Sequence, residues 1–482
     1  MLFNINRFHA FVLLTWQFGI FFASQQIFPI FSNYVPKWRC SSDEEFSKNC
    51  TIFAKCNGTV EFDIIYFKSS AMEYEWICGS NAYWAAFYSQ LQFIGVLIGT
   101  FTCGRLSDWL GRKPVALTAM TVGITISLLS AFSPTWQILL ASRFVIGLSI
   151  GGTLVVVCTF VMEMILPEQR MALRAFFNWG VARLLMTIIC YFFDDWRSAT
   201  IACAVFASPA IIILLFIFPE SPTWLHYKGR LQEMRESEKR MAKFAGVEYV
   251  EIPHAPVVHK KSFIDIVRDW QMFKRISVLW SMWFVASICG YAIDLNSSNI
   301  SGDLFMNQVI FSILIAGSKI VLVTFDTLYP SFSRRNLHQG SQGIAVICFL
   351  ILTILTLFHY DGMWILVVNV IGTVFIEMCW DACYLCGVEV MPTAMRATTM
   401  GSCSLIARIG AIMAPMLAHM NSIWQPSPYL TVVVLGTLNL FVSYNWLVET
   451  KGINLDHVEI ENDSELNKAE EDVKMLPQNL KA

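Results

Sequence analysis

Ionisable side chains stand inside several long apolar stretches of this sequence, and the most informative are Lys319, Glu377, Asp381 and Arg408. A basic residue deep in a membrane-spanning helix costs about 2.5–3.5 kcal/mol on insertion scales, so such residues face protein or water and mark binding sites. Glu377 and Asp381 are four residues apart and therefore share one helical face. The pattern indicates a site for a charged organic molecule, and two basic residues on two helices would make that site electropositive.

Each of these charges also has a structural interpretation. Lys319 could reach the membrane interface with its long side chain, or it could pair with Asp326, seven residues later. Arg408 could pair with Glu377 or Asp381. The two acids could themselves form a second polar lining or a proton-sensitive pair.

Aromatic residues occupy the same apolar stretches, and Tyr291 and Trp380 are the best candidates among them. Flat rings suit amphipathic organic ions, although aromatic residues also gather at lipid interfaces. Arg183 is a further buried basic candidate. The predicted substrate-binding residues are Lys319, Arg408, Tyr291, Trp380, Glu377 and Asp381.

The segments that must position these residues are long and apolar. The chain has 482 residues, of which 55% are hydrophobic and only 15% charged, with a mean hydropathy of +0.53. A soluble domain carries about 25% charged residues, and one bilayer crossing needs about 20 apolar residues. We therefore predict an all-α membrane protein. Its twelve predicted spans are 8–32, 83–103, 114–132, 137–160, 175–193, 198–218, 276–295, 305–325, 342–358, 364–387, 399–419 and 428–448.

The loops between these spans are asymmetric in charge. Short loops after even-numbered spans carry most of the basic residues, while those after odd-numbered spans carry Arg197 and little else. This bias predicts that both termini are cytoplasmic. The first span is too long for a signal peptide and lacks a small-residue cleavage site, so we expect it to be retained.

Residues 33–80 form a polar loop on the predicted outer side. Its four cysteines predict two disulfides and leave three pairings open, and they are Cys40, Cys50, Cys56 and Cys78. The predicted N-glycosylation acceptors are Asn49, Asn57, Asn296 and Asn299. Gly95-x-x-x-Gly99 and Gly147-x-x-x-Gly151 predict close helix packing.

The second half of the chain repeats features of the first. Asp326 to Arg335 follows span eight as Gly104 to Lys113 follows span two, and Glu389 to Arg396 follows span ten as Glu163 to Arg170 follows span four. Such duplication predicts a binding site near the midplane, between two bundles. The expected domains are an N-terminal six-helix bundle at 1–218, a cytoplasmic linker with short helices at 219–275, a C-terminal six-helix bundle at 276–448 and a disordered cytoplasmic tail at 449–482.

The polar segment Gly104-Arg105-Leu106-Ser107-Asp108-Trp109-Leu110-Gly111-Arg112-Lys113 contains Gly-x-x-x-Asp-x-x-Gly-Arg-Lys, which resembles the loop signature of the major facilitator superfamily. We read this segment as a tight turn between antiparallel spans. Three further motifs in the sequence are Glu75-Trp76-Ile77-Cys78, Pro219 to Leu225, and Glu389 to Arg396. Together with Gly401 to Gly410, these motifs resemble the organic ion transporter family. Sugar porters share part of the pattern but lack the long cysteine-bearing first loop.

This resemblance implies two six-helix bundles that rock against each other in alternating access. Lys319 and Arg408 resemble basic residues of the organic anion branch. The second-half loop departs from the family because it lacks the glycine-arginine turn, and Ile315 and Gly317 replace an acid and a proline. The resemblance implies gating ion pairs, with their role in fixing topology as the alternative. The predicted gating residues are Asp108, Arg112, Glu163, Arg170, Glu220, Glu389 and Arg396.

These observations predict a plasma-membrane secondary transporter of small organic ions, with organic anions as the first expectation. Organic cations or zwitterions such as carnitine are the alternative, and a non-transporting receptor is the third hypothesis. The sequence has no nucleotide-binding glycine loop, no histidine and cysteine cluster with metal spacing and no basic stripe for nucleic acid. We therefore expect no enzyme activity, no cofactor and no metal. The expected partners are the substrate and the lipid bilayer, and the chain is expected to act as a monomer.

Overall fold

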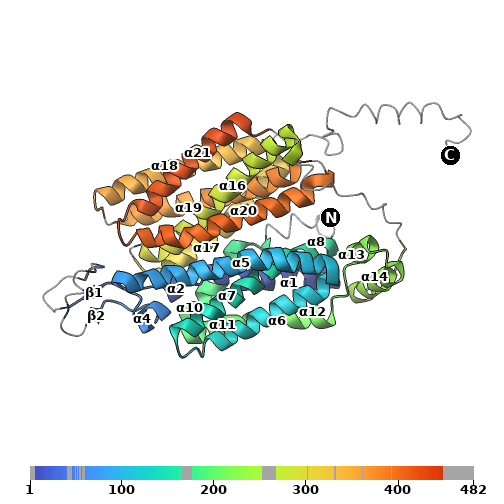
Figure 1. Cartoon of the computed structure of the whole chain (residues 1–482), viewed down its shortest axis with the longest axis horizontal. Coiled ribbons are helices and arrows are strands. Elements are labelled where there is room, and N and C mark those ends of the chain that lie inside the picture. The colour runs from blue at the N-terminus through green and yellow to red at the C-terminus, as the bar shows by residue number, and fades with distance from the viewer. Residues whose placement is uncertain are drawn as a thin grey trace, which may run out of the picture.

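Long helices, most of them running in similar directions, make up the computed structural model (Figure 1). It describes residues 6–40, 46–48, 50, 53, 56, 60–165, 176–251, 267–300, 302–329, 333–360, 362–391 and 393–448, without the side chains of 327 and 393–397. Figure 1 shows the helices in two groups that lie side by side. We call the group from α1 to α12 the N-half and the group from α16 to α21 the C-half.

The N-half follows the order of the chain. Its elements are α1 (Arg7–Ala23), η1 (Ser24–Gln26), α2 (Pro29–Ser32), β1 (Trp38–Arg39), β2 (Glu61–Phe62), α4 (Ser70–Glu73), η2 (Gly79–Asn81), α5 (Ala82–Leu110), α6 (Arg112–Ser130), α7 (Trp136–Gly152), the π-helical turn η3 (Thr153–Val157), α8 (Cys158–Met164), α10 (Trp179–Phe192), α11 (Trp196–Ala207) and α12 (Pro209–Phe216).

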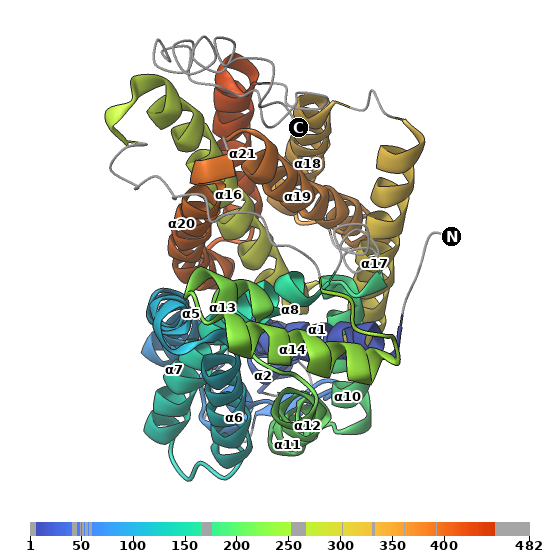
Figure 2. The same ribbon diagram turned by 90° about the vertical axis from the view of Figure 1, so that its right-hand side faces the viewer.

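Two short helices link the halves, and six long ones form the rest. These elements are α13 (Pro222–Tyr227), α14 (Leu231–Ala245), α16 (Trp270–Asn296), η4 (Ser297–Asn299), α17 (Leu304–Leu328), α18 (Arg334–Leu357), α19 (Met363–Glu389), α20 (Thr393–Met420) and α21 (Ser427–Trp446). Figure 2 looks onto the face that carries α13 and α14, which we call the linker face. The opposite face carries β1 and β2, and we call it the loop face.

The helices agree with the predicted spans. Within the described residues, eleven helices are long and apolar enough to cross a membrane by length and composition. The predicted span 175–193 corresponds to α10, which is apolar but shorter. The twelve predicted segments are therefore all represented by apolar helices.

Close packing of α5 against α7 explains the two glycine pairs. A Cβ atom on Gly95 or Gly99 would collide with the backbone of Phe144 or Leu148 in α7. Gly147 and Gly151 are equally close to the backbone of α5. The predicted role of these glycines in helix packing is confirmed, because only hydrogen atoms fit between the two backbones.

The turn between α5 and α6 is shorter than predicted. The sequence suggested a polar turn from Gly104 to Lys113, but α5 continues to Leu110 and α6 begins at Arg112, so the chain reverses at Gly111 alone. Gly111 has φ of 116°, a conformation that other residues rarely adopt. No proline interrupts the polar stretch, so α5 can continue until the positive φ of Gly111 ends it.

The cysteine-bearing loop contains the two predicted disulfides, paired as Cys40–Cys56 and Cys50–Cys78. The short strands β1 and β2 pair antiparallel beside them. Among the predicted glycosylation sites, Asn49 and Asn57 lie outside the described residues.

The two remaining acceptors differ in exposure. Asn299 is exposed, whereas the Asn296 side chain is 1% exposed. The Asn296 amide donates a hydrogen bond to the Tyr429 hydroxyl. A glycan has room at Asn299 and none at Asn296 in this conformation.

Glu73 attaches this loop to the start of α11. Its carboxylate forms an ion pair with Arg197 and accepts a hydrogen bond of 2.7 Å from the indole Nε1 of the fully buried Trp196. Partial burial raises the pKa of the Glu73 carboxyl, but the hydrogen bonds from Arg197 and Trp196 and the charge of Arg197 outweigh it. The pKa of Glu73 therefore lies below its ordinary value.

Replacing Glu73 with Gln is expected to lower stability by about 0.5–1 kcal/mol at neutral pH, since the ion pair is half-exposed. Because the folded-state pKa lies below the unfolded one, this stabilisation is present at neutral pH and is lost as the pH falls through the folded-state value. The difference in Tm between the wild-type protein and the variant should therefore shrink in acid. Glu75→Gln, at an exposed position of the same loop, is the control. Equal effects of the two substitutions would show that Glu73 does not attach the loop to the start of α11.

Candidate functional site

A buried ion pair joins the two halves. Arg183 of α10 donates hydrogen bonds of 2.6 Å to Asp294 of α16 and 2.7 Å to Gln308 of α17. Its side chain is 1% exposed, and that of Asp294 is 8% exposed. The Gln308 amide also donates to the Ser297 hydroxyl at 3.0 Å, which orients its oxygen toward Arg183. Arg183 therefore has a charged and a neutral partner, both from the other half.

Aromatic contacts between the halves lie near this pair. Phe305 of α17 stacks on Phe31 of α2 with 5.9 Å between ring centroids and meets Tyr191 of α10 edge-on at 5.4 Å. Phe93 of α5 packs against Tyr291 of α16 at 4.8 Å. These contacts, each between the N-half and the C-half, hold the halves together toward the loop face.

Lys319 does not pair with Asp326. Its Nζ lies 2.8 Å from Asp381 and 3.1 Å from Glu377, both on α19. The lysine is 9% exposed, so its charge is largely compensated inside the C-half. The two acids share one lysine, and the cluster of three carries one excess negative charge. The expectation that Lys319 makes the site electropositive is weakened by this pairing.

Arg408 of α20 is differently placed. It forms no ion pair with any residue that the structure describes, and its Nε has no hydrogen-bond partner there. The guanidinium lies near the hydroxyl of Tyr291 on α16. Tyr291 in turn donates a hydrogen bond of 3.1 Å to Gln26 of the N-half. Arg408 thus adjoins the contact between the halves.

Trp380 lies on α19 within a group of aromatic side chains. Its ring meets Trp283 of α16 edge-on at 5.7 Å and lies 6.2 Å from Tyr384. Its indole nitrogen approaches Gly290 of α16, one residue before Tyr291. Trp380 stands between Glu377 and Asp381 in the sequence of α19, so the aromatic residues and the charged cluster are neighbours.

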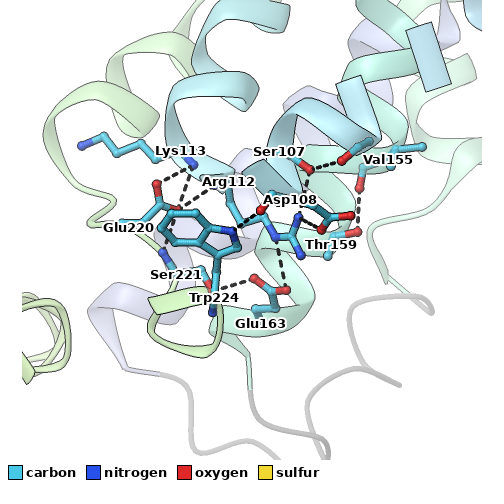
Figure 3. A network of polar contacts seen from close by, with 11 residues as sticks. Ser107, Asp108, Arg112, Lys113, Val155, Thr159, Glu163, Glu220, Ser221 and Trp224 are labelled. Carbon is cyan, nitrogen blue, oxygen red and sulfur yellow. Dashed lines mark hydrogen bonds and ion pairs between the residues drawn. The ribbon is translucent and has the colours of Figure 1, made fainter. Parts of the chain in front are cut away.

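On the linker face, Arg112 is the centre of a polar network (Figure 3). Its guanidinium lies 2.7 Å from Asp108 and 3.5 Å from Glu163. The Glu220 carboxylate accepts hydrogen bonds from the backbone N–H groups of Arg112 and Lys113 at 2.9 and 3.1 Å. A Cβ atom on Gly111 would collide with Glu220, so the glycine is needed for this contact.

The C-half repeats this network with different residues. Arg334 forms ion pairs of 2.5 Å with Asp326 and 3.2 Å with Glu389. Asp326, Arg334 and Glu389 therefore correspond to Asp108, Arg112 and Glu163. The absence of a glycine-arginine turn in the second half did not remove the ion pairs, because Arg334 begins α18 as Arg112 begins α6.

The predicted gating residues lie in these two networks, apart from Arg170 and the side chain of Arg396, which are outside the described part of the structure. The ion pairs of Arg112 with Asp108 and Glu163, and that of Arg334 with Glu389, each join residues of the same half. In this conformation they brace each half at the linker face.

Three further residues were missed as candidates by the sequence interpretation. Asp294 and Gln308 are the partners of Arg183, and an acid inside the predicted span 276–295 could have signalled the first of them. Arg143 of α7 is 0% exposed, and none of its guanidinium nitrogens has a hydrogen-bond partner in the described residues. It lies over the rings of Phe28 and Tyr88 at 5.1 and 4.8 Å, an arrangement that stabilises a cation.

Known proteins resemble this chain over most of its length. The model of the family described as sugar (and other) transporter matches residues 44–461. An uncharacterized protein of Caenorhabditis elegans is 37% identical over 478 residues, 94% of each chain. An organic cation transporter protein of Drosophila melanogaster is 28% identical over 400 residues, which cover 78% of this chain and 70% of that protein.

The fold also matches solved structures. The inward open conformation of the Escherichia coli xylose transporter XylE has a TM-score of 0.64 at 15% identity, covering 95% of this chain and 98% of that one. At this identity the similarity concerns the fold alone. It is the major facilitator fold, as the sequence predicted.

Replacing Asp294 with Asn is expected to leave Arg183 buried without a countercharge, which costs about 3–5 kcal/mol for pairs of this kind. Separation of the halves would hydrate the guanidinium, so the loop-face contact should open. A cysteine introduced at Phe305, which is 7% exposed, should then react faster with a membrane-impermeant maleimide.

Asp303→Asn is the matched control, because asparagine can still cap α17 there. Arg183→Met combined with Asp294→Asn should restore slow labelling, since no charge is left unpaired. Equal labelling rates in all these variants would show that the ion pair does not close this face.

Proposed function

The chain belongs to the sugar (and other) transporter family and has the major facilitator fold, and we infer its function from this membership. It is therefore a multi-pass membrane protein and a secondary transporter rather than an enzyme. We propose that it carries small organic anions across the plasma membrane, and that Arg408 recognises their carboxylate or an equivalent acidic group.

The charge balance around Arg408 supports this proposal. Arg183 is compensated by Asp294, and Lys319 by Glu377 and Asp381. Arg408 has no such partner in the described residues, yet it lies within a helix of the C-half beside Tyr291. A cation placed there is costly unless it has a counter-ion, and a substrate anion would supply one. The unpaired Arg408 is the observation that carries the proposal.

Lys319 takes a structural role in this proposal. It ties α17 to α19 through two carboxylates, and its loss would leave two acids close together without a countercharge. Tyr291 and Trp380 supply aromatic surface on α16 and α19 for the apolar part of the substrate. The substrate would lie between the halves, where major facilitator proteins bind their ligands.

The transport cycle follows from the contacts between the halves. The Arg183–Asp294 pair and the stacked Phe31 and Phe305 close the loop face. The ion pairs of Arg112 with Glu163 and of Arg334 with Glu389 each join residues of one half, which supports separation of the halves on that side during the cycle. This is the state in which a substrate would exchange with the cytoplasm, as both termini are expected to be cytoplasmic.

A zwitterion is the second candidate substrate. The cluster of Lys319, Glu377 and Asp381 carries one excess negative charge, which could bind a cationic group while Arg408 binds the acid. The name of the Drosophila relative, an organic cation transporter protein, also favours a cationic group. A zwitterion would use both charges at once.

Uptake of a labelled aromatic carboxylate into expressing cells tests the proposal. Arg408→Gln should raise KM by about 10- to 100-fold, as expected for the loss of a hydrogen bond to a charged group. Arg408→Lys should recover part of the affinity because the charge remains. Surface expression measured in parallel separates loss of binding from loss of protein.

Two further measurements distinguish the substrates. Lys319→Gln should lower surface expression, and Lys319→Gln combined with Asp381→Asn should restore it, with carboxylate uptake retained. Competition by betaine-like zwitterions stronger than that by simple carboxylates would favour the second candidate. Carboxylate uptake that does not change in Arg408→Gln would contradict the role given to Arg408.

A further inference from the structure

A cavity of about 530 Å³ opens on the linker face of the C-half, between the starts of α16 and α18 and the end of α21. It is remote from the charged residues proposed for transport. The lining residues used below are Gln271, Lys274, Arg275, Arg335, Asn445 and Trp446.

The lining of this cavity is basic. Lys274, Arg275 and Arg335 contribute three positive charges, and no acidic residue is among the lining residues that the structure describes. Arg335 is held in place by a hydrogen bond of 2.5 Å to the Tyr444 carbonyl. Lys274 lies over the Trp446 ring with 6.0 Å to its centroid. Three convergent cations in the described lining form a site for an anion.

Aromatic residues place the cavity at the edge of the bilayer. Trp270, Tyr444 and Trp446 are exposed by 73%, 66% and 45% around the same helix ends. Exposed Trp and Tyr residues at helix ends mark the level of the lipid headgroups. The cavity is therefore at the depth at which headgroup phosphates lie.

In the N-half, side chains of the protein fill the place that corresponds to this cavity. There the Lys113 ammonium donates hydrogen bonds to the Phe218 and Leu215 carbonyls at 2.6 and 3.1 Å, as Arg335 does to Tyr444. Arg240 of α14 reaches the same helix end through the Phe216 carbonyl at 2.7 Å.

Helix α14 lies across the ends of the N-half helices on this face (Figure 2). No helix in the described part of the chain covers the corresponding corner of the C-half. A helix of the linker thus completes the corner in the N-half, whereas none of the described helices does so in the C-half.

We propose that this cavity binds the phosphorylated headgroup of an anionic phospholipid. The guanidinium groups of Arg275 and Arg335 suit bidentate contacts with phosphate oxygens, and Lys274 adds a point charge. Basic pockets between transmembrane helices on the cytoplasmic side bind such headgroups. Bound there, the lipid bridges α16, α18 and α21 beside Arg334 and braces the C-half where the N-half is braced by α14.

The test is native mass spectrometry of the full-length protein, titrated with phosphatidylinositol 4,5-bisphosphate. The variant is Lys274→Gln, Arg275→Gln and Arg335→Gln together. Each basic residue near a membrane surface contributes about 5-fold to such binding, so affinity should fall on the order of 100-fold. Since Arg335 also bonds to Tyr444, the double variant without Arg335→Gln is made as well, with a fall of about 25-fold expected.

The control removes the same charge from the same face. Lys228→Gln, Lys239→Gln and Lys243→Gln change three exposed lysines on the linker segment, away from the cavity. The control should bind as the wild-type protein does. Equal losses in both triple variants would overturn the proposal, because surface charge alone would then explain binding.

The acidic segment 449–482 begins where the cavity wall ends and could instead occupy the site. A chain ending at residue 450 should bind the lipid as tightly as the full chain. Weak binding by the full chain that becomes at least 10-fold tighter after truncation would assign the cavity to the tail and overturn the proposal. Soluble inositol trisphosphate should compete only weakly, since an intact lipid also buries its tails, and full competition would assign the site to free phosphates.

Discussion

A charge inside an apolar helical bundle is tolerated only when an opposite charge or several hydrogen bonds compensate it. This constraint organises the centre of the molecule. Arg183 finds its counter-ion in Asp294 on the other half, and Lys319 finds two on a neighbouring helix. Because the Arg183–Asp294 pair crosses between the halves, Arg183 has this counter-ion only while the two halves are in contact there. Arg408 and Arg143 have no ion pair in the described residues, and Arg143 lies over two aromatic rings instead.

At the linker face, both halves hold their helix ends together with the same three residue types. An arginine at the start of one helix is held by an aspartate at the end of the preceding helix and by a glutamate from another. The residues around the arginine differ, since the N-half reverses at one glycine and the C-half uses a longer connection. What the duplication preserved is the ion-pair geometry, which holds three helix ends together in each half.

The halves differ most in what lies over that network. In the N-half, α14 covers the helix ends and supplies Arg240 to a free carbonyl. In the C-half, the equivalent place is a basic cavity surrounded by exposed aromatic residues. Among the described helices the two equivalent corners are covered unequally, and we propose that a lipid headgroup fills the uncovered one. Under that proposal, the lipid composition would change the stability of the C-half and leave that of the N-half unchanged.

Local properties of the chain determined much of the fold by themselves. Runs of apolar residues predicted the helices, and glycines four residues apart predicted the packing of α5 on α7. Repeated loop motifs predicted the two halves, and four cysteines predicted two disulfides. Each of these signals lies within a few consecutive residues or in a repeat that can be read directly.

Partners that are distant in the sequence were decided only by the tertiary structure. Lys319 had a candidate partner seven residues away in Asp326, yet it pairs with acids on α19, while Asp326 pairs with Arg334. The choice among three cysteine pairings and the pairing of Arg183 with Asp294 were equally open. The physical reason is that hydropathy and periodicity describe how one helix is built, whereas an ion pair depends on how several helices are rotated and placed against one another.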